Sequence, residues 1–500
     1  MDNFEYYPAK NIGPKKKSSW KRFWFFSFLI ILLLSLAYGS FVFYKVYSVS
    51  KKVNIEIQEE KPSFLETAKS LITKDEISLK NSNYRVNILL LGIAGKGRAG
   101  TNLTDTIMVA SLNLKTNQVA LISIPRDLYV TIPEMNIQTK INSVYQVGIG
   151  ASGNGQREGA KEIVATVEEI LAQKINYFVI LNFAGFEKII DSLGGINIMN
   201  ERDIYDASYP GPNYSYETFE LAKGFRQLDG ATALKYVRER HDDPEGDFGR
   251  AKRQQQVMQS TKNKILSPEI MLNVFAINNL LEALGENIIT DISSEEIKSF
   301  YNLTKKLDTQ NINNVVVDAW NKTSLLKVSH VFYGSTRAFV LVPRVGNWSE
   351  IQELSANIFD LNKIKRRKLE ITNENASIGI LNQSGNNQVA GKIQKLLNEN
   401  FGYKNVSLFK ENKKSLIETT LVYDETNGAK PFTLDEIAKK LPAQVSYEKF
   451  FLPLTSTEKQ DLVIVIGKDL ISKYNIEEDT LEDLNKARDD EEALQIKNTN

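Results

Sequence analysis

The sequence predicts an α/β fold in which a mixed β-sheet lies between helices, with an N-terminal transmembrane helix and a small C-terminal α/β module. Residues 86–93 are almost all apolar and end near glycines, as in a buried strand. Further apolar runs alternate with helical periodicity, which is typical of layered α/β domains. The predicted elements are strands at 86–93, 105–114, 119–124 and 177–181, a turn at 115–117, and helices at 157–171 and 186–193.

Composition excludes several kinds of chemistry. The chain has 500 residues, enough for two or three domains. Its net charge of +1 argues against a nucleic-acid partner, because such binding requires a broad excess of Lys and Arg. There is no cysteine, and His241 and His330 are the only histidines, which excludes thiol nucleophiles, disulfides and histidine-rich metal centres. The remaining chemistry is that of Asp, Arg and Mg²⁺.

Residues 23–44 are almost wholly apolar and long enough for a transmembrane helix of roughly 20 residues. Residues 1–22 carry several lysines just before this run, which favours a cytoplasmic N-terminus and a single-pass protein whose bulk is extracytoplasmic. A cleaved signal peptide is the alternative, but the apolar run is longer than a usual signal core, and no clear Ala-x-Ala site follows. Residues 45–84 are polar and predict a stalk.

The rest of the chain divides into further segments by pattern. Residues 85–266 form the predicted first domain, and 267–372 form a helical and strand extension that is either part of this domain or a separate small unit. Residues 375–472 predict a β-α-β module, with strands near 377–386 and 462–467 and a helix at 389–397. Residues 473–500 form a charged tail.

Two short motifs resemble nucleotide-binding signatures but lack the required context. Gly95-Lys-Gly-Arg-Ala-Gly100 matches G-x-G-x-x-G, yet a strand follows it, whereas the dinucleotide motif opens a helix. Asp247-Phe-Gly249 matches the kinase magnesium motif without the accompanying catalytic-loop motif. The first is better explained as a flexible loop at an active site.

Carboxylates and an arginine are expected at one edge of the sheet. Asp105 opens one predicted strand, and Arg126 and Asp127 follow the end of the next. If these strands are antiparallel neighbours, both ends meet, and oxygen ligands there suit Mg²⁺ carrying phosphate oxygens. The alternative is that Asp105 only caps a strand while Asp127 pairs with Arg126 on the surface.

Arginines bracket a second turn, in Tyr236-Val-Arg-Glu-Arg-His-Asp-Asp-Pro-Glu-Gly-Asp-Phe-Gly-Arg250. We expect a helix at 230–236 to end before Arg238 and Arg240, so that both point to one side of an extended segment. Asp247 then caps a helix at 248–265, with Arg250 in its first turn and Gln254 one turn later. Guanidinium groups near a helix N-terminus suit a phosphate. The alternative, an exposed charged helix, explains Lys252 and Arg253, but it does not explain why three other arginines flank one turn. His241 is interpreted as a loop-orienting residue.

In combination these motifs resemble the LytR-CpsA-Psr family, whose members attach secondary polymers to peptidoglycan. The matching motifs are Leu90-Leu-Gly92, Thr104-Asp-Thr106, Ile124-Pro-Arg-Asp127, Lys140-Ile-Asn142, the stretch from Phe183 to Ile196 with its Gly-Gly-Ile, Leu228-Asp-Gly230, Tyr236-Val-Arg-Glu-Arg240 and Asp247-Phe-Gly-Arg-Ala-Lys-Arg-Gln-Gln255. Residues 377–470 resemble the C-terminal module often found attached to this family.

The resemblance implies a membrane-anchored enzyme that binds a polyprenyl-pyrophosphate-linked glycan, with the lipid in an apolar tunnel. An acceptor hydroxyl of peptidoglycan would displace polyprenyl phosphate and leave a phosphodiester link. The resemblance also assigns the site. The catalytic residues are Asp105, Arg126, Arg238 and Arg240, and Asp105 is also the ligand of Mg²⁺ or Mn²⁺. The substrate-binding residues are Arg250, Gln254, Lys140 and Asp127.

One departure from the family pattern concerns the metal. Many relatives have a second metal-binding Asp after the first strand, where this chain has Gly92-Ile-Ala-Gly-Lys-Gly-Arg98. Either the metal binds more weakly, or Asp127 or Asp247 replaces that ligand. Two other functions fit the same residues: a pyrophosphohydrolase that cleaves the lipid-linked donor with water, and a non-catalytic anchor that binds wall polymer.

Overall fold

The structure is a computed structural model that describes residue 44 and residues 79–474, except for gaps at 99, 153–154, 211–214, 240–242, 244–246, 266, 268–284, 286, 294–295, 297–298, 301, 304–305, 320–323, 334–335, 410–415 and 451–458. The predicted transmembrane helix at 23–44, apart from Tyr44, lies outside these residues, as do most of the stalk and the tail after residue 474. Within the described ranges, no helix is both long and apolar enough to cross a bilayer.

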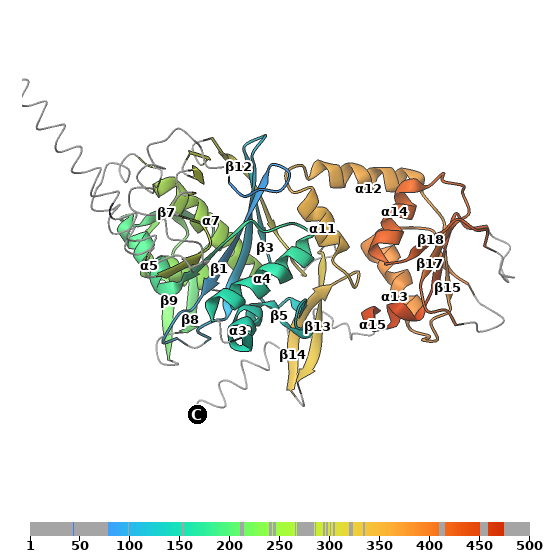
Figure 1. The fold of residues 1–500 in the computed structure, drawn as a ribbon, viewed down its shortest axis with the longest axis horizontal. Coiled ribbons are helices and arrows are strands. Elements are labelled where there is room, and N and C mark those ends of the chain that lie inside the picture. Colours follow the sequence, from blue (N-terminus) through green and yellow to red (C-terminus); the bar gives the residue numbers. More distant parts are fainter. Residues whose placement is uncertain are drawn as a thin grey trace, which may run out of the picture.

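A six-stranded mixed sheet organises the first domain, in the order β11-β6-β1-β2-β3-β12. Figure 1 labels three of its strands, β1, β3 and β12. Its strands are β1 (Arg85–Ile93), β2 (Thr104–Asn113), β3 (Gln118–Ser123), β6 (Tyr177–Asn182), β11 (Ile288–Thr290) and β12 (Asp308–Val316). The β2–β3 pair is antiparallel, as expected from the short predicted turn at 115–117. Strand β1 also pairs antiparallel with β2, across the longer loop at 94–103. Strand β6 is parallel to β1, which fits the helical crossover between them.

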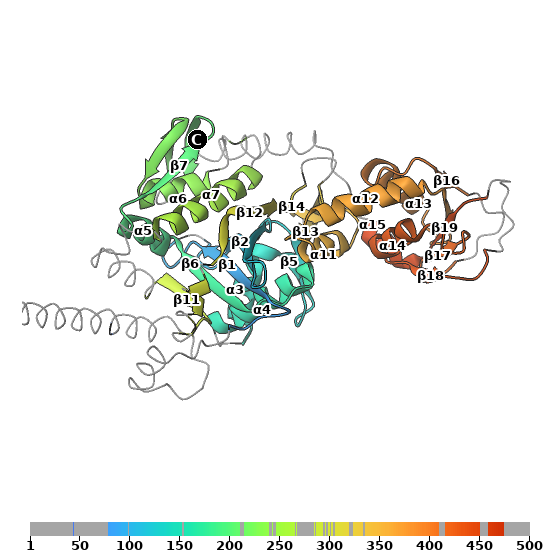
Figure 2. The ribbon, with the colours of Figure 1, turned by 90° about the horizontal axis from the view of Figure 1, so that it is seen from above.

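Helices cover both faces of this sheet (Figure 2). One face packs against α3 (Ile141–Ser152) and α4 (Gln156–Leu171), and the other lies beneath α5 (Phe183–Ser192), α6 (Gly230–Arg238) and α7 (Asp247–Ile265). Strand side chains alternate between the faces. Leu89 and Leu91 therefore belong to the core shared with α3 and α4, whereas Leu90 and Met108 point toward α5–α7. The predicted helices correspond to α4 and α5; α3 was not predicted.

The predicted end of the first domain at residue 266 is wrong, because the domain continues beyond this residue. Strand β11 pairs with β6, and β12 pairs with β3, so the following segment supplies both edges of the sheet. The segment at 267–372 is therefore an extension of the first domain. It also contains a hairpin of β13 (Leu326–Tyr333) and β14 (Thr336–Pro343).

Three smaller hairpins or strand pairs complete this domain. They are β4 (Tyr129–Ile132) with β5 (Ile137–Lys140), β7 (Ile196–Asn200) with β10 (Gly224–Leu228), and β8 (Ile204–Pro210) with β9 (Tyr216–Leu221). The β7–β10 and β8–β9 pairs pack with α6 and α7 in a separate apolar cluster.

The C-terminal module has its own core and a five-stranded sheet in the order β16-β15-β19-β17-β18. Its strands are β15 (Ile378–Asn382), β16 (Val406–Leu408), β17 (Leu421–Asp424), β18 (Gln444–Ser446) and β19 (Leu462–Ile466). Its helices include α13 (Val389–Lys395) and α14 (Pro431–Lys440). Strands β15 and β19 are parallel, so the predicted β-α-β arrangement is confirmed. The predicted boundary between the extension and the module, at residues 372–375, falls at the end of α12 (Asn362–Glu374).

A buried ionic cluster joins the two domains where α11 (Ser349–Ala356) meets α14. Arg344 donates two hydrogen bonds of 2.7 Å to Glu350. Lys440 Nζ lies 3.3 Å from Glu350 Oε1 and 3.1 Å from Glu353 Oε2. Burial alone would lower the pKa of Lys440, but the surrounding carboxylates raise it, so its ammonium stays charged near neutral pH. Because each charge has a buried partner, removing one leaves the others uncompensated.

Replacing Glu350 with Ala is expected to destabilise the protein by about 3 to 5 kcal/mol, because Arg344 and Lys440 would keep buried charges without their shared carboxylate. Urea unfolding measures this change. The matched control is Glu418→Ala, which removes a carboxylate that is 78% exposed and paired with Lys468; its effect should stay below about 1 kcal/mol. Equal effects of the two substitutions would contradict the assigned role of the cluster.

Candidate active site

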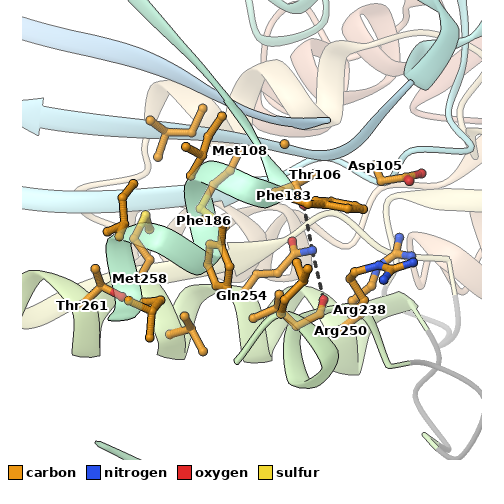
Figure 3. Close-up of a pocket in the computed structure, with 18 of the residues that line it drawn as sticks. Asp105, Thr106, Met108, Phe183, Phe186, Arg238, Arg250, Gln254, Met258 and Thr261 are labelled. Atoms are coloured by element: carbon orange, nitrogen blue, oxygen red, sulfur yellow. Dashed lines mark hydrogen bonds between the residues drawn. The ribbon is translucent and has the colours of Figure 1, made fainter. Parts of the chain in front are cut away.

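A cavity of about 790 Å³ lies between the sheet and helices α5–α7. Its two ends differ in chemistry (Figure 3): Asp105, Arg238 and Arg250 lie at one end, and Phe186 and Met258 lie at the other. Most of the wall is apolar. The apolar lining residues include Leu90, Met108, Val179, Leu181, Phe183, Phe186, Ile189, Ile190, Leu234, Val237, Val257, Met258, Ile265 and Phe300. The cavity therefore suits an elongated ligand with one anionic end and one hydrocarbon end.

The edge of strands β2 and β3 supplies the first part of the polar end. Asp105 is the second residue of β2, and Arg126 follows the end of β3. Arg126 Nη1 donates a hydrogen bond of 2.9 Å to Asp105 Oδ1, so the predicted convergence of the two strand ends is confirmed. Both side chains line the cavity. Their exposures of 20% for Arg126 and 35% for Asp105 leave both accessible to a ligand.

Lys140 and Asp127 lie beside this edge but are not among the residues that line the cavity. Lys140 Nζ donates a 2.7 Å hydrogen bond to Asp127 Oδ1, and Arg126 Nε lies 3.4 Å from Asp127 Oδ2. Leu341 N, on β14, donates to the carbonyl of Asp127 at 2.9 Å. Asp127 thus contacts Arg126 on the side away from the cavity and fixes its orientation. The predicted contacts of Asp127 and Lys140 with substrate stay predictions.

Arg238 and Arg250 form the opposite side of the polar end. Helix α6 does not stop at residue 236 as predicted: it includes Arg238, and the backbone becomes extended only at Glu239, because the buried Tyr236 and Val237 hold the last turn against the domain. The Arg238 guanidinium carbon lies 4.8 Å from the centroid of the Phe183 ring, within range of a cation–π contact. Arg250 is 8% exposed.

The predicted N-cap of the next helix shifts by one residue. Helix α7 begins at Asp247 itself, so Asp247 is its first residue and Arg250 lies in its first turn, as expected. The side chain of Asp247 lies outside the described part of the structure, and so do Arg240 and His241. The predicted roles of these residues stay predictions.

Three consecutive glutamines fasten α7 to three different strands. Gln254 Nε2 donates to Thr106 Oγ1 on β2 at 2.9 Å. Gln255 Nε2 donates to Ser123 Oγ on β3 at 2.9 Å, and Gln256 Nε2 donates to the Met199 carbonyl on β7 at 2.7 Å. Gln254 lines the cavity as predicted for a substrate-binding residue, but its amide also fixes the helix that carries Arg250.

Arg253 is the functional residue that the sequence interpretation missed, because it was assigned to an exposed helix face. It is 7% exposed. Its Nε donates to the Tyr236 carbonyl at 2.9 Å, its Nη2 lies 3.3 Å from Glu239 Oε2, and its Nη1 pairs with Asp243. We call Arg253, Tyr236, Glu239 and Asp243 the Arg253 cluster. It ties the end of α6 and the following turn to α7, and so positions Arg238 relative to Arg250.

The phenol of Tyr209, which also lines the cavity, stays neutral. Burial raises its pKa to about 12, although Arg238 acts in the opposite direction. Lys262 lines the cavity next to Thr261, and burial lowers its pKa. Neither residue offers an acid or base matched to neutral pH at the polar end.

The residues at the polar end fit one hard divalent cation only if a ligand contributes oxygens. Within the residues that the structure describes, no group of three or more acidic or histidine side chains is placed to hold a metal. Asp206 and Glu239 also line the cavity, but they are only 4% and 1% exposed. Among the described residues that line the cavity, Asp105, with a side chain 35% exposed, is the accessible carboxylate. Mg²⁺ commonly binds through one or two carboxylates, waters and substrate phosphates, so this set is sufficient with a diphosphate present.

The chain belongs to the LytR_cpsA_psr family, whose sequence pattern matches residues 40–338. The resemblance inferred from the motifs is thus confirmed. Residues 375–470 match a second family, described as LytR cell envelope-related transcriptional attenuator.

Curated relatives carry the name polyisoprenyl-teichoic acid–peptidoglycan teichoic acid transferase TagU. The Enterococcus faecalis protein is 31% identical over 283 residues, covering 56% of this chain and 82% of the relative. The Bacillus mycoides protein is 33% identical over 280 residues, covering 55% and 80%. Among solved structures, B. subtilis TagV matches with 25% identity and a TM-score of 0.42, covering 56% of this chain and 99% of that one.

Gly249→Ala is expected to disrupt the Arg253 cluster, because a β-carbon at this position would overlap the Asp243 carboxylate. We expect a loss of roughly 1 to 3 kcal/mol in the free energy of unfolding, the usual range for overpacking, measured by urea unfolding. The control is Gly150→Ala in α3, where an added β-carbon has no atom within 4 Å. Because alanine favours helix over glycine, this control should not destabilise the protein. A Gly249→Ala variant as stable as the wild type would contradict the assignment.

Proposed function

We propose that this protein is a membrane-anchored, extracytoplasmic phosphotransferase that moves a glycan from a polyprenyl-pyrophosphate donor to peptidoglycan. The observation that carries the proposal is the convergence of Arg126, Arg238 and Arg250 at one end of a cavity whose wall is mostly apolar. A prenyl diphosphate has the same division into an anionic end and a hydrocarbon chain. The names of the TagU relatives support the reaction, and a teichoic-acid-type glycan is accordingly the proposed cargo.

The apolar part of the cavity accounts for binding of the lipid. Burial of hydrocarbon is worth about 25 cal/mol per Å² removed from water, and this term does not depend on the glycan. Phe186 and Met258 line the part of the cavity away from the charges (Figure 3). The prenyl chain in the apolar part of the cavity would therefore determine how far the donor enters, and so place its diphosphate at the polar end.

The arginines account for recognition and activation of the diphosphate. Each guanidinium presents a planar fork of donors that matches phosphate oxygens and stays charged at any working pH. Asp105 would hold Mg²⁺ or Mn²⁺ together with phosphate oxygens, and the ion would supply further positive charge when bound. Arg240, which the family motif also includes, is proposed to join this set.

The proposed reaction is a substitution at the phosphorus attached to the glycan. An oxygen of the peptidoglycan acceptor forms the new phosphorus–oxygen bond, and the bond to the bridging oxygen of the pyrophosphate breaks. Polyprenyl phosphate leaves with the electron pair, and the hydroxyl proton passes to a base that the described residues do not identify. Arg126, Arg238 and Arg250 would stabilise the charge that develops on the leaving and equatorial oxygens, the main catalytic task in phosphoryl transfer.

A reconstituted transfer assay tests this function. The full chain is mixed with a purified polyprenyl-pyrophosphate-linked glycan, peptidoglycan and Mg²⁺, and both polyprenyl phosphate and glycan-bearing peptidoglycan are measured. Asp105→Ala and Arg238→Ala should each lower transfer by roughly 10²-fold or more, the usual effect of losing an electrostatic stabiliser. Arg366→Ala, on an exposed side chain of α12, is the matched control and should retain activity.

Three outcomes would contradict the proposal. Full turnover in both site variants would mean that the reaction occurs elsewhere. Release of free phosphorylated glycan despite the presence of acceptor would indicate a pyrophosphohydrolase. Donor binding that survives removal of Mg²⁺, without release of polyprenyl phosphate, would indicate a non-catalytic anchor.

A further inference from the structure

The loop between β1 and β2 brings another guanidinium, that of Arg98, against the ring of Phe183; Phe183 lines the cavity, whereas Arg98 itself does not. The Arg98 guanidinium carbon lies 5.5 Å from the centroid of the Phe183 ring, and the Arg238 guanidinium carbon lies 4.8 Å from the same centroid. Phe183 lines the cavity near Asp105 and Arg238 (Figure 3). One aromatic ring therefore contacts a cation of the polar end and a cation of the loop.

Hydrogen bonds within the loop hold Arg98 at this place. Gly95 N donates to the Thr101 carbonyl at 3.0 Å, and Arg98 N donates to the Gly95 carbonyl at 3.3 Å. Thr101 Oγ1 donates to the Arg98 carbonyl at 2.7 Å. Gly95 has φ +86°, and a β-carbon there would lie 2.9 Å from Cβ of Asn182, the N-cap of α5. Glycine at position 95 thus lets the loop pack against the start of the helix that carries Phe183.

The charge of this loop is wholly positive. Residues 94–101 include Lys96 and Arg98 and contain no carboxylate. Arg98 Nη2 lies 3.7 Å from Glu187 Oε1, but the two side chains are 41% and 32% exposed, and ion pairs with such exposure contribute little. The side chain of Arg126 is only 20% exposed. Arg98 therefore lies farther toward solvent than Arg126 and can exchange Glu187 for another anion.

We propose that Arg98 is a further donor-binding residue that contacts a phosphate within the glycan, outside the pyrophosphate. This inference rests on the proposed function, because the position of the diphosphate at Arg126, Arg238 and Arg250 leaves the glycan to extend outward. A cation at the rim then meets the first part of the glycan rather than the lipid. Its guanidinium selects donors whose glycan carries phosphate, as in a teichoic-acid-type polymer, over donors with an uncharged glycan.

Two donors with the same prenyl pyrophosphate separate this role from general binding. One donor carries a phosphate-bearing glycan and the other an uncharged glycan, and KM and kcat are measured for the full chain with each. Arg98→Ala should raise KM for the phosphate-bearing donor roughly tenfold, as expected for one lost charged hydrogen bond. Its kcat, and both constants for the uncharged donor, should stay at wild-type values. Arg98→Lys should raise KM for the phosphate-bearing donor less than Arg98→Ala does, because lysine keeps the positive charge. Arg366→Ala should leave KM and kcat for both donors at wild-type values.

Unchanged KM for both donors in Arg98→Ala would overturn the inference. Equal increases for both donors would also overturn it, because Arg98 would then act on the shared pyrophosphate or on the loop. Failure of the wild-type protein to transfer either donor is a different result, since it contradicts the proposed function itself. A KM ratio between the two donors that is insensitive to ionic strength in the wild type would likewise count against a charge-based selection.

Discussion

The attachment of helix α7 to the sheet is the constraint on which the rest of the site depends. Gln254, Gln255 and Gln256 are consecutive, so they project around the helix and reach β2, β3 and β7 respectively. Two of these hydrogen bonds end at hydroxyls of the strands themselves. This places Arg250 beside the strand edge that carries Asp105 and Arg126. Farther along α7, Met258 and Thr261 face the apolar part of the cavity (Figure 3), so a single helix lines both of its ends.

Charges in this protein are divided between those that are satisfied internally and those that are available to a ligand. The Arg253 cluster and the interdomain cluster around Glu350 are buried and paired, and they fix the relative positions of elements. Arg126 has Asp127 behind it and Asp105 in front, so it keeps its orientation while one side faces the cavity. Arg238 lies over the ring of Phe183. Preorganised cations of this kind stabilise developing negative charge without rearrangement during the reaction.

Local patterns were sufficient to predict the parts of the fold that are close in sequence. The strands β1, β2 and β3 follow from apolar runs. The short turn between β2 and β3 makes these two antiparallel and accounts for the meeting of Asp105 with Arg126. The pairing of edge strand β11 with β6 and of β12 with β3 was not predicted, because it joins segments that are distant in sequence. The burial of Arg253 depends on Asp243, which comes from a separate turn. The one feature of the sequence that could have indicated this contact is Gly249, because its lack of a side chain leaves room for the Asp243 carboxylate.

The central claim is that the apolar cavity and the arginines at its end bind the two parts of one prenyl diphosphate. An experimental structure of the full chain with a bound long-chain prenyl pyrophosphate tests this most directly. We expect the diphosphate within hydrogen-bonding distance of Arg126, Arg238 and Arg250, and the prenyl chain in contact with Phe186 and Met258. A diphosphate bound on another face, or a prenyl chain outside an empty cavity, would contradict the account.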